Sequence, residues 1–313
     1  MTVSTEFSSK YFSLISLAEG VWAALSIPGT GSWSNAGIID MGDQTIIFDA
    51  FATPTAAQDL RIAAEKLTGR QATIVLNSHY HLDHVSGNQV FQDVPIMSTK
   101  LTREQIAIQQ PRLIEIFKNN PEYLDQVKAE LEQEESYQKR QELEDLLGEY
   151  SMILKDTERF KLTLPTITFE DTITLNGARM YAEFTTYGGG HTCSDSFLYL
   201  PKEQVIFLAD LMHIGYHADF RQGNVDQWIN ILERVKKLKI KTIVSGHGGI
   251  GTAEELDKMI DYLNTLKQIS VDWVQHEGTI ENIDEIDIPK RYASYGAPSI
   301  FHYNIKSLLE KGI

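Results

Sequence analysis

Thr73-Ile-Val-Leu-Asn-Ser-His-Tyr-His-Leu-Asp-His84 joins a short apolar run to four side chains that bind metal ions in proteins. The apolar run is typical of a buried β-strand. Residues two apart in an extended chain point to the same side, so His79 and His81 can share one metal ion. Asp83 and His84 lie beyond the turn and can face a second metal ion or a bound water. Imidazole and carboxylate together suit zinc and, to a lesser degree, iron or manganese, so this stretch predicts a metal centre.

Three further segments place candidate ligands directly after predicted strands. Gly188-Gly-Gly-His191 is a glycine run that ends in histidine, Phe207-Leu-Ala-Asp210 ends in a carboxylate, and Ser245-Gly-His247 ends in histidine again. Each has an ordinary alternative, since an aspartate after a strand can cap the next helix and a Gly-His-Gly loop can be a simple turn. Together with the first cluster they form an ordered series at strand ends, which is where α/β folds place their chemistry.

Strand-like and helix-like segments alternate along most of the chain. The expected strands lie at 45–50, 73–77, 180–186, 196–200, 204–209 and 242–245. The expected helices lie at 57–70 and 225–239, and a third is expected to begin at Thr252 with a capping box. This alternation predicts an α/β layered fold, which we expect to form one domain over residues 1–313.

The region from about 101 to 159 departs from that alternation. It is charged and favours helix, and leucines such as Leu143 and Leu146 form an apolar stripe. The simpler interpretation is a helical insertion that packs on the main body with a solvated acidic face. The sharper one is a lid beside the site or an element through which two copies form a homodimer.

The composition of the chain indicates which partners it can bind and in which compartment it lies. The formal net charge of −15 disfavours binding to phosphate backbones, so we expect a small-molecule substrate and no nucleic acid. Apolar runs are too short for a membrane span, and the first residues lack the basic start of a signal peptide. The single cysteine, Cys193, excludes an intramolecular disulfide and fits a cytoplasmic location. We expect it to be a small buried residue.

The ordered set of motifs resembles the metallo-β-lactamase superfamily. The resemblance runs from about Asn35 to Leu263 and rests on the H-x-H-x-D-H signature at 79–84, on Asp49 before it, and on His191, Asp210 and His247 in family order. It implies an αββα four-layer sandwich, here with a helical insertion, and a site at one edge between the two sheets. It also implies two divalent metal ions: one held by His79, His81 and His191, the other by Asp83, His84 and His247, with Asp210 bridging both.

The same resemblance narrows the activity. Because it has an aspartate at position 210, the chain resembles thioesterases of the glyoxalase II type, acyl-homoserine lactonases and the ribonuclease Z group. True β-lactamases usually lack this aspartate. The segment Gly190-His-Thr-Cys-Ser-Asp195 has aspartate where many thioesterases and lactonases have histidine, and it resembles a broad set of hydrolases and cyclase-like proteins.

These features predict a hydrolase in which a hydroxide bridging two metal ions attacks the carbonyl of an ester, lactone, thioester or amide. Asp83 is expected to orient that hydroxide and carry a proton. Asp49 is expected to support a ligand histidine, and His213 occupies the place where lactonases have a tyrosine near the substrate carbonyl. The alternatives are an iron-dependent oxidoreductase of the persulfide dioxygenase type and a binding protein with an inert metal site.

Overall fold

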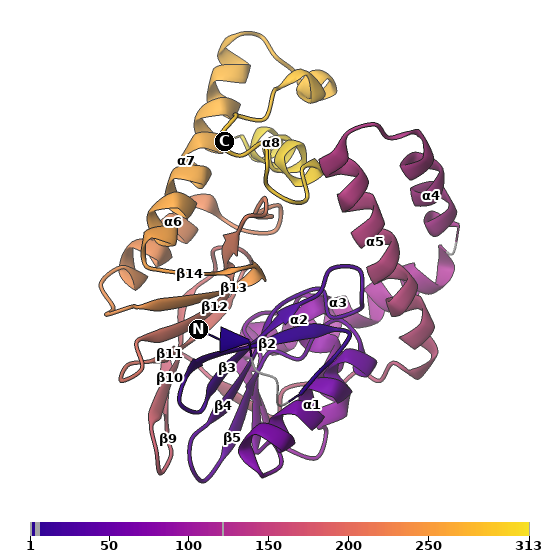
Figure 1. The fold of residues 1–313 in the computed structure, drawn as a ribbon. Helices are drawn as coiled ribbons and strands as arrows, with labels where there is room; N and C mark the ends of the chain where they lie inside the picture. The colour runs from indigo at the N-terminus through magenta and orange to yellow at the C-terminus, as the bar shows by residue number, and fades with distance from the viewer. Residues whose placement is uncertain (1, 4–6, 121, 313) are drawn as a thin grey trace.

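Two β-sheets stacked face to face lie at the centre of the molecule (Figure 1). The structure is a computed structural model that describes residues 2–3, 7–120 and 122–312. The first sheet has eight strands in chain order: β1 (Thr2–Val3), β2 (Phe12–Ala18), β3 (Val21–Ser26), β4 (Ala36–Asp40), β5 (Thr45–Phe48), β6 (Ile74–Leu76), β7 (Ile96–Thr99) and β8 (Ile167–Phe169).

The second sheet has six strands in the reverse of chain order. From one edge to the other they are β14 (Ile250–Gly251), β13 (Thr242–Gly248), β12 (Val205–Ile214), β11 (Asp195–Leu200), β10 (Tyr181–Gly188) and β9 (Thr172–Asn176). The strands β11 and β12 pair antiparallel, so the expected strands at 196–200 and 204–209 form a hairpin.

Strand direction brings the candidate ligands to one edge of the sandwich. In the first sheet β5, β6, β7 and β8 run parallel, and in the second sheet β12 and β13 run parallel. The carboxyl ends of parallel neighbours meet at the same edge. The segments that follow β5 and β6 therefore lie beside each other, as do the carboxyl-terminal parts of β12 and β13.

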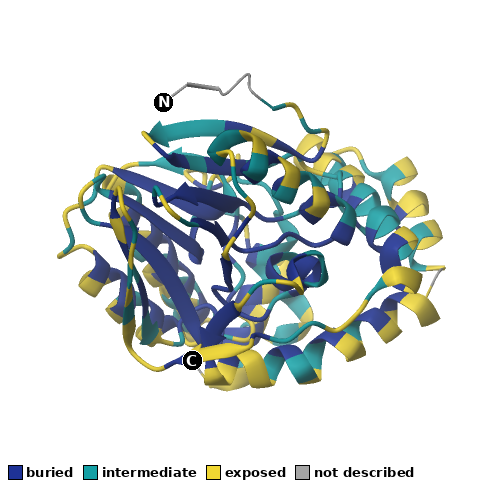
Figure 2. Ribbon diagram, turned by 90° about the horizontal axis from the view of Figure 1, so that it is seen from below, coloured by how far each residue is buried: buried dark blue, intermediate teal, exposed yellow. Residues whose placement is uncertain are grey.

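Alternating side chains of the strands build two apolar layers. Ile46 and Phe48 of β5 point between the sheets and pack against the second sheet, where the ring centroid of Phe48 lies 5.7 Å from that of Phe207. Ile47, between them in sequence, points outward into a separate cluster with helix α1. This period of two is the signature of a strand buried on both faces. Figure 2 shows the strands largely buried and the helices exposed along their outer sides.

Helices cover the outer face of each sheet. The first sheet is covered by α1 (Pro54–Thr68), which begins at the side-chain cap Thr53 and ends at Gly69 in the left-handed conformation. The second sheet is covered by α6 (Val225–Val235), α7 (Glu254–Gln275) and α8 (Ser299–Lys311), with η3 (Ile280–Glu285) between the last two. The α/β class and the αββα order of layers are confirmed. The capping box expected at Thr252 is wrong, because α7 begins after Ala253 without a side-chain cap.

Three helices stand between β7 and β8, in the region where strand signals disappear from the sequence. They are α3 (Lys100–Asn119), α4 (Tyr123–Gln133) and α5 (Tyr137–Asp156), followed by η2 (Thr157–Arg159). The helix α5 is fixed to the main body at both ends. A Cβ at Gly148 would lie 2.3 Å from the backbone oxygen of Gly29, so only glycine allows this approach. Asp156 accepts a hydrogen bond of 2.6 Å from Thr55, and Glu142 accepts one of 2.9 Å from Ser299 at the start of α8.

None of the helices in the described part of the chain combines the length and the apolar character that a membrane span requires.

Candidate metal centre

Ends of strands and the loops after them bring seven ligand-type side chains together. His79 and His81 follow β6, and the short helix α2 (Leu82–Val85) carries the next two candidates, Asp83 and His84. The other three, His191, Asp210 and His247, come from the loop between β10 and β11, from β12 and from β13. They form two groups in which the ligand atoms all lie within 4.8 Å of one another: His79, His81, His191 and Asp210 in the first, and Asp83, His84 and His247 in the second.

The first group is held around one oxygen of Asp210. Its Oδ2 lies 3.2 Å from Nε2 of His191 and 3.7 Å from Nε2 of His79. The Nε2 of His191 also lies 3.0 Å from Nδ1 of His81. Three ring nitrogens and a carboxylate oxygen therefore face a common centre, and such a set of donors can hold a divalent metal ion.

The second group shares that carboxylate. Nε2 of His84 lies 3.1 Å from Oδ1 of Asp210 and 3.5 Å from Oδ2 of Asp83. Nε2 of His247 lies 3.2 Å from the same Asp83 oxygen and 3.4 Å from Oδ2 of Asp210. Asp210 is thus in contact with both groups, in the position that a bridging ligand requires.

Local backbone geometry explains how Asp210 reaches this position. The pairing of β12 with β13 shifts register on both sides of Ala209, and Ala209 has a φ of 46°, in the left-handed region. Such irregularities re-aim a side chain at the cost of strain. A Cβ at Gly246 on β13 would lie 1.9 Å from Oδ1 of Asp210, so glycine at 246 is required for the carboxylate to fit.

Several buried atoms of the cluster have no hydrogen-bond partner among the described residues. They are Nε2 of His79, Nε2 of His84 and Oδ1 of Asp210. Buried polar atoms without partners destabilise a fold, and most folds avoid them. These three point into the centre of the cluster, where a divalent cation would satisfy all of them. The nitrogen and oxygen donors present therefore fit divalent metal ions.

The pKa values of the histidines show that the charges in the cluster favour cations. Burial lowers the pKa of His79 well below 6.5, with the charge of His84 adding to the effect. Burial also acts on His84, but the carboxylates of Asp210, Asp83 and Asp49 outweigh it and hold its pKa well above 6.5. The negative charges in the cluster thus favour a positive charge beside them, and bound metal ions would take the place of those protons.

A second layer of hydrogen bonds fixes the rings of the first group. Nδ1 of His79 lies 2.9 Å from Oγ of Ser78, and Nδ1 of His191 lies 2.6 Å from the backbone oxygen of Asp219. Nε2 of His81 lies 3.1 Å from Oε1 of Gln222. In each ring the bonded nitrogen is the one that faces away from the cluster. Such bonds set the tautomer and the orientation of a metal ligand.

Asp49 plays the same part for the second group. It follows β5, has a φ of 58° and is fully buried. Its carboxylate accepts hydrogen bonds from the backbone nitrogen and the hydroxyl of Ser78, and lies 2.8 Å from Nδ1 of His84. The sequence predicted a supporting role for Asp49, and the structure shows which groups it supports.

Asp195, the aspartate at the position where many thioesterases and lactonases have histidine, supports the loop around His191. Its buried carboxylate accepts hydrogen bonds from the backbone nitrogens of Gly190 and Thr192 and from the hydroxyl of Thr192. Those residues flank His191. Asp195 therefore closes the loop that carries His191, and it does not join either ligand group. Cys193, which we expected to be buried, is exposed on this loop; that expectation is wrong.

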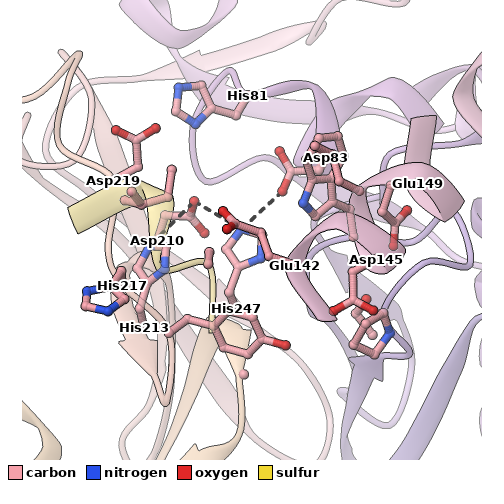
Figure 3. A pocket seen from close by; sticks show the side chains of 18 of the residues that line it. His81, Asp83, Glu142, Asp145, Glu149, Asp210, His213, His217, Asp219 and His247 are labelled. Atoms are coloured by element: carbon pink, nitrogen blue, oxygen red, sulfur yellow. Dashed lines mark ion pairs between the residues drawn. The ribbon is translucent and has the colours of Figure 1, made fainter. Parts of the chain in front are cut away.

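A cavity of about 310 Å³ opens beside the two groups. Among the ligands His81, Asp83, His191, Asp210 and His247 line it (Figure 3). The lining also includes Trp33, in the loop before β4, and His213, whose ring stacks on that of His247 with centroids 5.2 Å apart. Burial lowers the pKa of His213 to about 3, so its imidazole is neutral at physiological pH.

Two sets of contributors were missed from the sequence. Gln222 and Asp219 support the ligand rings, and the helix α5 supplies Glu142, Asp145 and Glu149 to the cavity. Neither set carries a local signal. Gln222 lies 141 positions from His81 along the chain, and the sequence of α5 does not show which of its acidic residues face the cavity.

Comparison with known proteins agrees with this architecture. The family model of the metallo-beta-lactamase superfamily matches residues 29–247, a range that contains all seven ligand-type residues. The chain is similar to a metallo-beta-lactamase from Pontibacter korlensis, with 16% identity, a TM-score of 0.60, and coverage of 81% of this chain and 99% of that one. It is also similar to a metallo beta lactamase from Erythrobacter litoralis with beta mercaptoethanol in its active site, with 14% identity, a TM-score of 0.59, and coverage of 83% and 99%.

Proposed function

The chain belongs to the metallo-beta-lactamase superfamily, and from that premise we propose that it is a hydrolase of carbonyl compounds that works with two divalent metal ions. Zinc is the preferred metal, and the substrate is an ester, lactone, thioester or amide. The observation that carries the proposal is the shared carboxylate of Asp210, which lies within 3.7 Å of ring nitrogens of both ligand groups.

The chemistry needs both groups at once. Bound there, divalent ions would make water a strong nucleophile near neutral pH and would polarise a carbonyl oxygen. His79, His81 and His191 would hold one ion, and Asp83, His84 and His247 the other, with Asp210 between them. Asp210 and His247 lie within β12 and β13, Asp83 and His84 lie on the short helix α2, and the other three ligands lie in segments that follow strands. Such rigid supports suit a site that must hold its geometry during reaction.

Asp83 is the group proposed to handle the proton. Burial alone would raise its pKa, but the charges of His84 and His247 outweigh that effect and bring the pKa to about 2. Asp83 is therefore ionised at neutral pH and lines the cavity. An ionised carboxylate here accepts a hydrogen bond from the attacking water, and it can pass a proton to the leaving group.

His213 is proposed to contact the substrate oxygen. Its Nε2 is buried, has no hydrogen-bond partner among the described residues, and lies 3.8 Å from Oδ2 of Asp210. Because the imidazole is neutral, it suits a hydrogen bond to a carbonyl oxygen better than it suits proton donation. His213 stands at the position where lactonases of the family have a tyrosine.

The proposal is tested with a panel of esters, lactones, thioesters, β-lactams and phosphodiesters, each measured with and without a chelator. We expect hydrolysis of at least one carbonyl class, its loss with the chelator, and its recovery on adding zinc. Elemental analysis of protein purified without added metal belongs to the same test. One iron per chain together with oxygen consumption on a persulfide substrate would favour the oxidoreductase instead. Hydrolysis unaffected by the chelator would contradict the proposal.

A further inference from the structure

The helix α5 gives the cavity an acidic wall, defined here as the side chains of Glu142, Asp145 and Glu149. They lie three and four positions apart, so they share one face of the helix, and all three line the cavity. Figure 3 shows them on the α5 side of the pocket, across from Asp219, His213 and His217.

Each carboxylate of the acidic wall is hydrogen-bonded by neutral donors only. Glu142 accepts from the hydroxyl of Ser299 at 2.9 Å, Asp145 from the side-chain amide of Gln141 at 3.2 Å, and Glu149 from the backbone nitrogen of Gly31 at 2.8 Å. Within the described part of the chain, no ion pair includes any of the three. By contrast Glu144, which faces outward on the same helix, pairs with Arg140.

Outside the metal centre, the described residues that line the cavity offer no free lysine or arginine to balance the wall. Arg221 is the one lysine or arginine among the lining residues, and its guanidinium is held by the carboxylate of Asp219 at 2.6 Å and 3.0 Å. Burial lowers the pKa of His217 to about 4, so its imidazole is neutral. The charges of Asp83 and Asp210 are already engaged with the histidines of the metal centre.

One carboxylate oxygen of Glu149 is an independent observation that points to a bound ligand. Its side chain is 2% exposed, and its Oε1 is buried without a hydrogen-bond partner among the described residues. Burial raises its pKa to about 7. A buried carboxylate oxygen left without a donor destabilises the fold unless something supplies one. A bound group with positive charge would supply the donor or the charge.

Aromatic side chains complete the surroundings. Trp33 and Tyr216 line the same cavity as the acidic wall, together with apolar groups such as Leu146 and Ile300. Aromatic faces attract organic cations, and carboxylates close by strengthen that attraction. The combination suits an ammonium group attached to a short apolar chain better than a bare metal ion, which would need more oxygen ligands than the wall provides.

We propose that the acidic wall binds a cationic group of the substrate, so that the preferred substrates are carbonyl compounds with an organic ammonium group on the acyl side. The inference rests on the proposed function, because it assigns the far end of the substrate that the metal centre would cleave. Electrostatic attraction would draw such substrates into the cavity and fix the distance between charge and scissile bond.

The test uses matched pairs of 4-nitrophenyl esters and the metal-loaded protein. One ester of each pair carries a trimethylammonium group, the other an uncharged tert-butyl group of the same shape, joined to the carbonyl by one, three or five methylene groups. We expect kcat/KM to favour the cationic ester by about 10- to 100-fold at the best length, because a quaternary ammonium is attracted to aromatic faces and carboxylates through its charge. Equal kcat/KM within every pair would overturn the inference.

Variants assign the preference to α5. Asp145→Asn and Glu149→Gln should each reduce the ratio of the two kcat/KM values, and the triple variant that also carries Glu142→Gln should bring it close to one. Glu144→Gln is the matched control, since it removes the same charge from the outer face of the same helix, and the ratio should stay at the wild-type value. If the triple variant does not fold, the two single variants decide. An unchanged ratio in both would overturn the inference.

A binding measurement separates this inference from the proposed function. Pentyltrimethylammonium is titrated into wild-type and variant protein by calorimetry, which requires no turnover. Binding to the wild type that weakens about tenfold or more in the Asp145 and Glu149 variants supports the acidic wall even if no ester is hydrolysed. In that case only the proposed function has failed. No binding to the wild type overturns the inference even if neutral esters are hydrolysed.

Discussion

The metal centre and the acidic wall face the same cavity and balance their charges in opposite ways. In the metal centre, every carboxylate lies against histidines, as Asp210 does with Oδ2 3.2 Å from His191. In the wall, the carboxylates of α5 have only neutral partners, and the pKa of Glu149 is raised to about 7 by burial. Histidines thus lower the pKa of the carboxylates of Asp83 and Asp210 in the centre, whereas burial raises the pKa of the carboxylates in the wall.

The difference teaches that position in the fold, more than residue type, determines what a carboxylate does. The centre stands on strand ends and short turns, where geometry is rigid and partners are preset. The wall stands on a helix inserted between β7 and β8 and held by contacts such as Gly148 with Gly29. Changes to the centre should therefore remove the chemistry, whereas changes to the wall should adjust selectivity and stability.

The largest effect is expected from Asp210→Ala. This change removes the carboxylate that both ligand groups share, so both metal ions should be lost and hydrolysis should fall to the level of metal-free protein. Elemental analysis and a turnover assay on the same sample measure this. Asp171→Ala, at an exposed aspartate, should change neither. If Asp210→Ala keeps two metal ions per chain, the proposed difference between the metal centre and the acidic wall is contradicted.

A smaller effect is expected from Asp83→Asn, which keeps the shape but cannot take a proton. For a substrate with a poor leaving group, kcat should fall by about 10²–10⁴-fold, and for an activated ester by less. Metal content is measured in the same preparation, because loss of an ion would lower both rates. Equal losses on both substrates, with the metals retained, would limit Asp83 to ligation and orientation.

Asp49→Asn should weaken metal binding while leaving every direct ligand in place. Asp49 accepts hydrogen bonds from Ser78 and lies 2.8 Å from Nδ1 of His84, and loss of such support typically lowers metal affinity by about 10–100-fold. Competition with a chromophoric chelator measures the affinity. An unchanged affinity would mean that the ring of His84 is fixed by packing alone.

The smallest effect is expected in the wall, from Glu149→Gln, and it appears in stability. Because burial raises the pKa of Glu149 from 4.5 to about 7, the unfolded chain loses this proton at lower pH than the folded chain does. The stability contributed at pH below 4.5 is therefore lost as pH rises towards 7, by at most about 3 kcal/mol. Glu149→Gln should flatten this fall in denaturant unfolding, and Glu144→Gln should not. The same pH slope in Glu149→Gln and wild type would contradict the assignment.

The metal centre could be predicted from the sequence, whereas the acidic wall could not. The ligands at 79–84 lie in one short stretch, and strand-end geometry links them to His191, Asp210 and His247, so local pattern and family resemblance were enough to find them. The layers of the fold were found for the same reason, since periods of two and 3.6 are local. Element boundaries were less accurate: α1 begins at Pro54 and not at 57, α6 ends at Val235 and not at 239, and Thr252 carries the residue type of a cap but does not cap α7.

The acidic wall could not be predicted from the sequence, because its place beside the cavity depends on how α5 packs on the main body. The acidic residues along α5 look alike in sequence, and only the contacts of Gly148 and Ser299 decide which of them turn inward. The exposure of Cys193 and the anchoring role of Asp195 depend likewise on how one loop closes. Long-range packing of this kind leaves no periodic or motif signal.

Metal stoichiometry tests the central claim most directly. Metal-free protein is titrated with zinc, and bound metal is measured for the wild type, His79→Ala, His247→Ala and the exposed control His276→Ala. The account predicts two ions per chain for the wild type and the control. It predicts loss of the ion of the first group in His79→Ala and of the second group in His247→Ala, so that each variant retains at most one. Two ions retained in both variants, or a single ion in the wild type, would contradict it.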